Sequence, residues 1–106
     1  MENKYKIPWH IRQFVKTELM DYEKNVKLAK DKKSNTRKLL IVDKRLTQIE
    51  NVLNNLNDDD REAAKLIFFK KYSPNKAEIE RGISKAAYYH AMNKVIFLVA
   101  VEMDLI

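Results

Sequence analysis

Apolar residues recur at steps of three and four along the start of the chain, with polar residues filling the positions between them. Pro8 precedes this stripe and suits the first position of a helix, where a missing backbone N–H costs nothing. The spacing therefore predicts one long amphipathic helix from Pro8 to about Asp31. The stripe comprises Ile11, Val15, Leu19, Tyr22, Val26 and Ala29.

A second stripe alternates spacings of three and four, as in a heptad seam, and comprises Leu39, Val42, Leu46, Ile49, Leu53 and Leu56. The polar residues Ser34-Asn35-Thr36 stand between the two stripes, and their side chains can cap the second helix. Two apolar stripes joined by a short polar link predict an antiparallel helical hairpin over residues 1–57.

The second half of the chain predicts three further helices. Acidic residues at Asp58 to Asp60 suit the start of a helix that continues to about Tyr72. That helix is expected to bury Ala63, Leu66, Ile67 and Phe69. Ser73-Pro74 then predicts a cap and first turn for a short helix ending near Arg81, and Ser84 can cap a last helix to about Met103. One glycine and two prolines in 106 residues leave little material for β-turns, so the predicted class is all-α.

The link between the last two helices predicts a helix-turn-helix within residues 58–106, because each residue of the turn has a physical task. Gly82 allows a positive φ angle, Ile83 holds the turn to the core, and Ser84 caps the recognition helix. In that helix the residues expected to face inward are Ala87, Tyr88, Ala91, Met92, Val95 and Val99. Those left to face DNA are Lys85, Ala86, Tyr89, His90, Asn93 and Lys94.

Charge supports a nucleic-acid partner. The chain has 21 Lys and Arg against 15 Asp and Glu, a net charge of +6, and its basic residues gather in the segments 24–38 and 65–94. Asn can contact adenine, Lys can reach guanine or phosphate, and Ala or Tyr can meet a thymine methyl group or a sugar. The expected DNA-binding residues are Lys70, Lys71, Lys76, Ser84, Lys85, Ala86, Tyr89, His90, Asn93 and Lys94. For the segment 24–38 a solvated face is favoured over an extra phosphate contact.

Three segments carry a resemblance to known proteins: the helix from Ile11 to Tyr22, the stretch from Asp60 to Tyr72, and the Gly82–Lys85 turn followed by Tyr88-Tyr89-His90. The C-terminal part resembles region four of bacterial sigma factors, and the whole chain resembles the small phage transcriptional regulators of the RinA/ArpU type. The resemblance implies a phage-encoded or mobile-element regulator of transcription, with double-stranded DNA as its partner and RNA polymerase as a further candidate.

Two features bear on architecture and assembly. Such motifs usually have an aliphatic residue before the turn glycine, where this chain has Arg81, so the preceding helix is expected to be short or irregular. The run from Val95 to Val101 is apolar on every side and so should be surrounded by protein. Either a homodimer interface or packing against the N-terminal hairpin would satisfy it, and we favour the dimer. Trp9 is either a core anchor or an exposed partner contact.

Other functions find less support in the residues. The chain has no cysteine, its two histidines stand far apart, and it has no glycine-rich phosphate loop, so we expect no metal, no cofactor and no enzymatic activity. The first residues lack a signal-peptide core and the longest apolar run is too short to span a bilayer, so a cytoplasmic location in a bacterial host is expected. Two alternatives stay open: a small terminase subunit that binds packaging-site DNA, and a protein–protein inhibitor or antirepressor that does not bind DNA.

Overall fold

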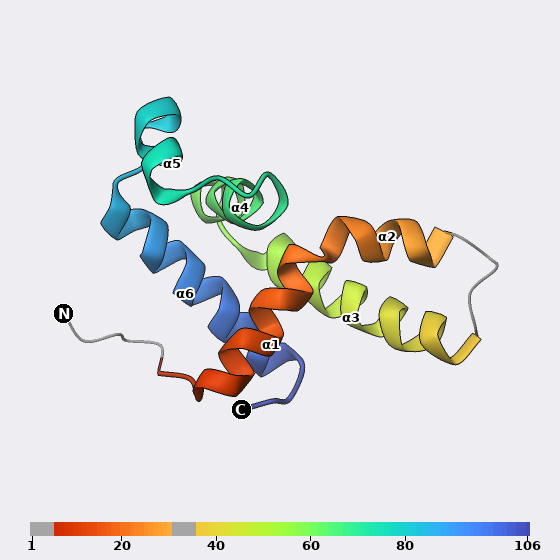
Figure 1. Cartoon of the computed structure of the whole chain (residues 1–106). Coiled ribbons are helices and arrows are strands. Elements are labelled where there is room, and N and C mark those ends of the chain that lie inside the picture. The colour runs from red at the N-terminus through yellow and green to blue at the C-terminus, as the bar shows by residue number, and fades with distance from the viewer. Residues whose placement is uncertain (1–5, 31–35) are drawn as a thin grey trace.

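The structure, a computed structural model, describes residues 6–30 and 36–106, and from residue 36 to 42 it describes the backbone only. Every element within these ranges is helical, which confirms the expected all-α class (Figure 1). In chain order the elements are α1 (Trp9–Met20), α2 (Tyr22–Lys30), α3 (Thr36–Asn55), α4 (Asp58–Ala64), the π-helix η1 (Lys65–Phe69), α5 (Pro74–Arg81) and α6 (Lys85–Glu102). The expected cap at Ser34-Asn35 lies outside the described residues, as do Lys32 and Lys33.

The predicted long N-terminal helix is wrong, because it breaks at Asp21. This residue takes φ −91° and ψ 6° and separates α1 from α2. The break has a tertiary reason. α1 packs against α6, whereas α2 packs against α3, and these two partners run in different directions (Figure 1). One straight helix could not follow both. The apolar stripe of α1 still faces inward, with Val15 and Leu19 fully buried, whereas Val26 and Ala29 of α2 are only half-buried.

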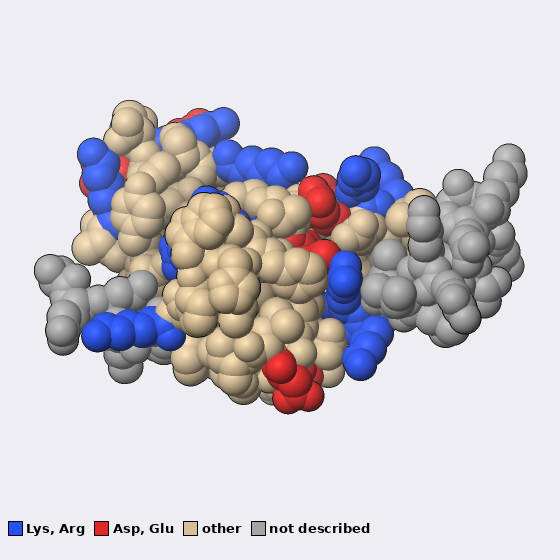
Figure 2. Space-filling model, turned by 60° about the horizontal axis from the view of Figure 1, so that its bottom comes forward, with Lys and Arg blue, Asp and Glu red and all other residues tan. Residues whose placement is uncertain are grey.

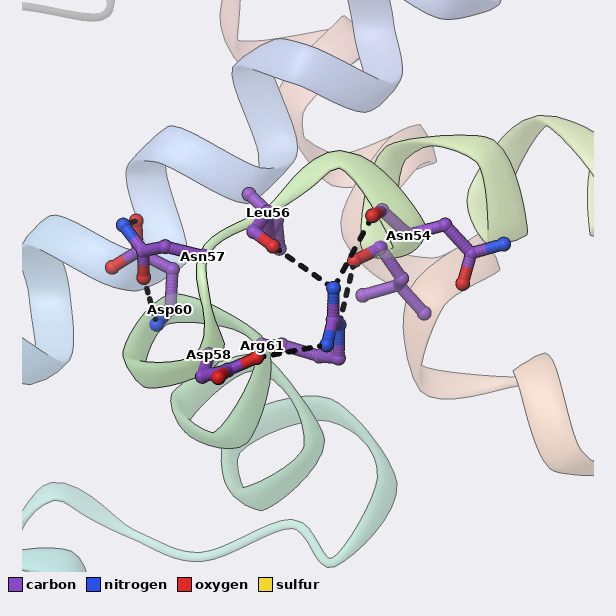
Figure 3. Close-up of polar contacts among 7 residues, drawn as sticks. Asn54, Leu56, Asn57, Asp58, Asp60 and Arg61 are labelled. Atoms are coloured by element: carbon purple, nitrogen blue, oxygen red, sulfur yellow. Dashed lines mark hydrogen bonds and ion pairs between the residues drawn. The ribbon is translucent and has the colours of Figure 1, made fainter.

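A single arginine holds the corner between α3 and α4 (Figure 3). Arg61 donates hydrogen bonds from its guanidinium to the backbone carbonyls of Leu53, Asn54 and Leu56 at 3.0, 3.2 and 2.9 Å. These carbonyls lie at the end of α3, where the helix supplies few further donors, although the Leu53 carbonyl also accepts from the Leu56 N–H at 3.2 Å. Arg61 also pairs with Asp58 at 3.1 Å. The start of α4 is therefore tied to the end of α3.

The predicted helix from Asp59 to Tyr72 is also only partly correct. After Ala64 the backbone widens into η1, where the Lys70 N–H donates to the Lys65 carbonyl five residues earlier at 2.9 Å. A wider turn places more successive residues on one face. Leu66, Ile67 and Phe68 are consequently all buried, and Phe68, which the α-helical period had not placed in the core, is fully so. Phe69, expected to be buried, is only half-buried.

The last helix, α6, lies at the centre of the molecule and contacts α1, α3, α4 and α5. The apolar second half of α6 packs against α1 and α3 of the same chain. This is the second of the two expectations for the run from Val95 to Val101, packing within the chain, and not the dimer interface that the sequence favoured. Val95, Ile96, Val99 and Ala100 are fully buried in this way. They belong to one cluster with Val15 of α1, Ile49 of α3 and Phe68 of η1, so both halves of the chain share a core.

Candidate nucleic-acid interface

The local signals around α5 act as the sequence predicts. Ser73 caps this helix, since its Oγ accepts from the backbone N–H of Lys76 at 3.1 Å, and Pro74 occupies the first turn. Gly82 ends the helix with φ 67° and ψ 20°, a left-handed conformation that glycine adopts at little cost. Of the two expectations for this helix, short or irregular, the structure shows the first, because α5 is a regular helix of only eight residues that ends at Arg81. Ala77, which is fully buried, supplies its packing contact in place of an aliphatic residue beside the glycine.

The start of α6 is held by one cap and one long-range hydrogen bond. Ser84 Oγ accepts from the backbone N–H of Ala87 at 3.1 Å, and Ile83 packs against the core as expected. One turn into the helix, the buried Tyr88 donates its hydroxyl to the carbonyl of Tyr72 at 2.6 Å. Burial raises the pKa of the Tyr88 hydroxyl, and the neighbouring Tyr89 raises it further. The first two turns of α6 are thus fixed to the segment that precedes α5.

Most of the expected contact residues are exposed at this end of α6. Lys85, Ala86, Tyr89 and His90 all face solvent, and Tyr89 is 50% exposed. Ser84 is exposed too, although its hydroxyl is engaged as the cap. Lys70, Lys71 and Lys76, which precede the turn, are exposed as well. The start of α6 therefore presents a small, an aromatic and a cationic side chain to solvent.

Lys94 was expected to face DNA, but the structure places it in an ion pair between α6 and α4. Its Nζ lies 2.6 Å from Oδ2 of Asp60 on α4, in an ion pair whose side chains are only 29% and 20% exposed. Lys94 stands ten residues beyond the Ser84 cap, where α4 crosses close to α6. Since Asp60 neutralises it, Lys94 stabilises the contact between the two helices.

Lys76 and Asn93 are also less available than expected. Lys76 lies 4.4 Å from the centre of the Tyr72 ring and 3.8 Å from Glu80, so its charge is shared within α5. Asn93 is half-buried, and its Oδ1 is a buried acceptor without a hydrogen-bond partner. An unpaired buried acceptor costs about 1–3 kcal/mol, which favours an outward rotation of the side chain once a donor such as an adenine amino group is offered.

The side of α6 that faces α4 is acidic. Ala87 was expected to be buried, but it is exposed and lines a hollow of about 450 Å³ between the turn and α4. Asp59, Asp60 and Glu62 line the same hollow. The carboxylates of Asp59 and Glu62, which are not balanced by Lys94 as Asp60 is, repel phosphate, so a duplex would approach α6 from the side of Lys85 and Tyr89 instead.

Two exposed residues on α5 were not among the expected contacts. Arg81 stands next to Gly82 and, in the described part of the chain, forms no ion pair. It is the basic residue nearest the turn on the α5 side and could have been included for that reason. Ile79 is 82% exposed and packs against nothing in the core. Trp9, the other unassigned large side chain, is 74% exposed.

Comparison with known protein families, curated proteins and solved structures finds no match for this chain. Within residues 6–30 and 36–106, no helix is long and apolar enough to cross a membrane. The same residues contain no cluster of three or more histidine, aspartate or glutamate side chains placed to hold a metal ion.

Proposed function

We propose that the chain is a sequence-specific DNA-binding protein and that α5, the turn at Gly82 and α6 form its helix-turn-helix. The observation that carries the proposal is the start of α6, where a capped helix end exposes Lys85, Ala86 and Tyr89 while Tyr88 is anchored in the core. A rigid helix with small and polar residues exposed in its first turns fits the major groove. The N-terminal helices would support this unit through the shared core.

The proposed role is regulation of transcription in a phage or mobile element, as the resemblance to RinA/ArpU-type regulators implies. Double-stranded DNA is the proposed partner, with RNA polymerase and a second copy of the chain as further candidates. A dimer would bring two copies of α6 to half-sites about 34 Å apart. It could not use the inward face of the second half of α6, because Val95, Ile96 and Val99 are fully buried within one chain.

Enrichment of a random-sequence duplex pool on the immobilised chain tests sequence specificity and requires no assumption about the target sequence. We expect a discrete motif to emerge and the chain to leave a footprint on it. Lys85→Ala with Tyr89→Ala should abolish the footprint and leave the helical circular dichroism spectrum unchanged. Val101→Ala is the matched control, since Val101 is 45% exposed at the opposite end of the same helix. A pool that stays random even at low salt would refute the proposal.

A further inference from the structure

The molecule carries a second group of cations that the helix-turn-helix does not include. Lys24 and Lys27 of α2 line a hollow of about 350 Å³ together with Lys71, which follows η1. Met20 and Phe69 also line this hollow. The sequence separates Lys27 from Lys71 by more than forty residues, so their proximity is a product of the fold.

Two features hold this arrangement in place. The ring of Tyr22, at the start of α2, stacks on Phe69 at the end of η1 with centroids 4.8 Å apart. Lys71 has φ 57°, a left-handed conformation that is unusual for a residue with a side chain. The backbone N–H of the following residue, Tyr72, donates a hydrogen bond to the Leu66 carbonyl at 3.0 Å. The segment after η1 is therefore tied down beside α2.

The lysines of this hollow are free to bind an anion. Among the described residues, Lys24, Lys27 and Lys71 are all exposed and form no ion pair. Asp21, which separates α1 from α2, and Glu23, in the first turn of α2, also line the hollow, so three lysines stand against two carboxylates there. The local balance remains positive.

A continuous series of contacts connects the hollow with the start of α6. Tyr72, the residue after Lys71, lies under the ammonium group of Lys76 and accepts the hydrogen bond of Tyr88. The ring of Tyr88 in turn meets the edge of Tyr89, with centroids 5.3 Å apart. Figure 2 shows Lys and Arg side chains spread along the upper edge of the molecule, above a broad uncharged area. Figure 1 places α5 at the upper left and α2 at the right, with α4 between them.

We propose that Lys24, Lys27 and Lys71 bind the phosphate backbone of the same duplex beside the site contacted by α6. This inference rests on the proposed DNA-binding function and adds a second, sequence-independent contact region. The dimensions fit, because the molecule is 43 Å long and one turn of duplex rises about 34 Å. Because α2 lies on one side of α6 only, the extra contacts fall on one flank of the site.

The test uses the full chain and three duplexes that contain the selected motif. One is a core of about 12 base pairs, and each of the other two extends this core by about one helical turn on one flank only, on opposite sides. We expect tighter binding to one of the extended duplexes. Lys24→Gln with Lys27→Gln should remove this gain and leave core binding unchanged. Each lost phosphate contact makes the slope of log affinity against log salt concentration shallower by about 0.9. Raising the salt from 50 to 200 mM should therefore weaken binding of the extended duplex roughly tenfold more for the wild type than for this double variant.

Lys6→Gln with Lys44→Gln is the matched control, since both lysines are exposed and neither lines this hollow. It removes the same charge and should keep the wild-type slope. Equal slopes for both double variants and the wild type on all three duplexes would overturn the inference and leave the proposed helix-turn-helix intact. An equal loss on the core and the extended duplexes would also overturn it. Absence of any selected motif would overturn both proposals.

Discussion

Replacing Lys94 by methionine removes the positive charge that pairs with Asp60 and keeps a long, unbranched side chain that favours helix. The pair is short, at 2.6 Å, and its side chains are 29% and 20% exposed. Exposed ion pairs contribute about 0–1 kcal/mol, and breaking a fully buried pair costs about 3–5 kcal/mol. A pair between these limits should contribute about 1–2 kcal/mol. For a chain of this length, that loss corresponds to a fall in Tm of roughly 4–10 °C.

Thermal unfolding of the wild type, Lys94→Met, Asp60→Asn and the double variant measures this contribution. The double-mutant cycle is needed because Asp60 also accepts a hydrogen bond from Asn57 at 3.2 Å, which Asp60→Asn perturbs as well. We expect a coupling energy of about 1 kcal/mol between positions 60 and 94. The cycle removes the contribution of Asn57 from the comparison.

DNA binding by the same variants separates a structural role of Lys94 from a phosphate contact. Lys94→Met should leave the salt slope of DNA affinity unchanged, measured where the protein is fully folded. Lys85→Met, which removes an exposed charge at the start of α6, should lower that slope by about 0.9. A Lys94→Met variant with unchanged Tm and a reduced slope would refute the assignment, because it would place this ammonium on DNA instead of on Asp60.

Three further predictions concern stability. Arg61→Ala should cost about 2–3 kcal/mol in urea unfolding, because three carbonyls at the end of α3 lose a charged donor, and Arg61→Lys should recover less than half of it. Gly82→Ala should cost only about 1 kcal/mol of unfolding free energy, which is the strain of a left-handed alanine, because an added Cβ meets no atom within 4 Å. Gly82→Asn should cost less. A loss above about 3 kcal/mol for Gly82→Ala would contradict the absence of a steric clash. Burial, and then the hydrogen bond and charge of Glu50, raise the pKa of Tyr22 from 10.0 to about 12. A pKa that is raised in the folded state contributes stability that is present below pH 10 and is lost toward pH 12. After allowance for solvent screening, the unfolding free energy of the wild type should fall by about 1–2 kcal/mol more than that of Tyr22→Phe between pH 9 and 12. Equal losses would argue against a raised pKa of the Tyr22 hydroxyl in the folded protein, and so against the burial and the Glu50 contact together.

Local sequence determined the features that depend on a few neighbouring residues. Ser73, Gly82 and Ser84 act within four residues of their own position, through a side-chain cap or a permitted φ angle, so their roles follow from residue type and spacing. The all-α class follows in the same way from helical periodicity and the scarcity of glycine and proline. The exposure of Lys85, Ala86, Tyr89 and His90 also follows, since they lie on the side of α6 opposite the apolar stripe.

Only the tertiary structure decided the features that depend on a partner element distant in sequence. The break at Asp21 arises because α1 and α2 pack on different helices, and the burial of Phe68 arises from a widened turn that periodicity does not anticipate. Lys94 pairs with Asp60 because α4 packs against α6 close to Lys94. The sequence alone specifies two capped helices that meet at Gly82, whereas the packing of α4 against α6 decides that Lys94 pairs with Asp60 while Lys85 stays exposed.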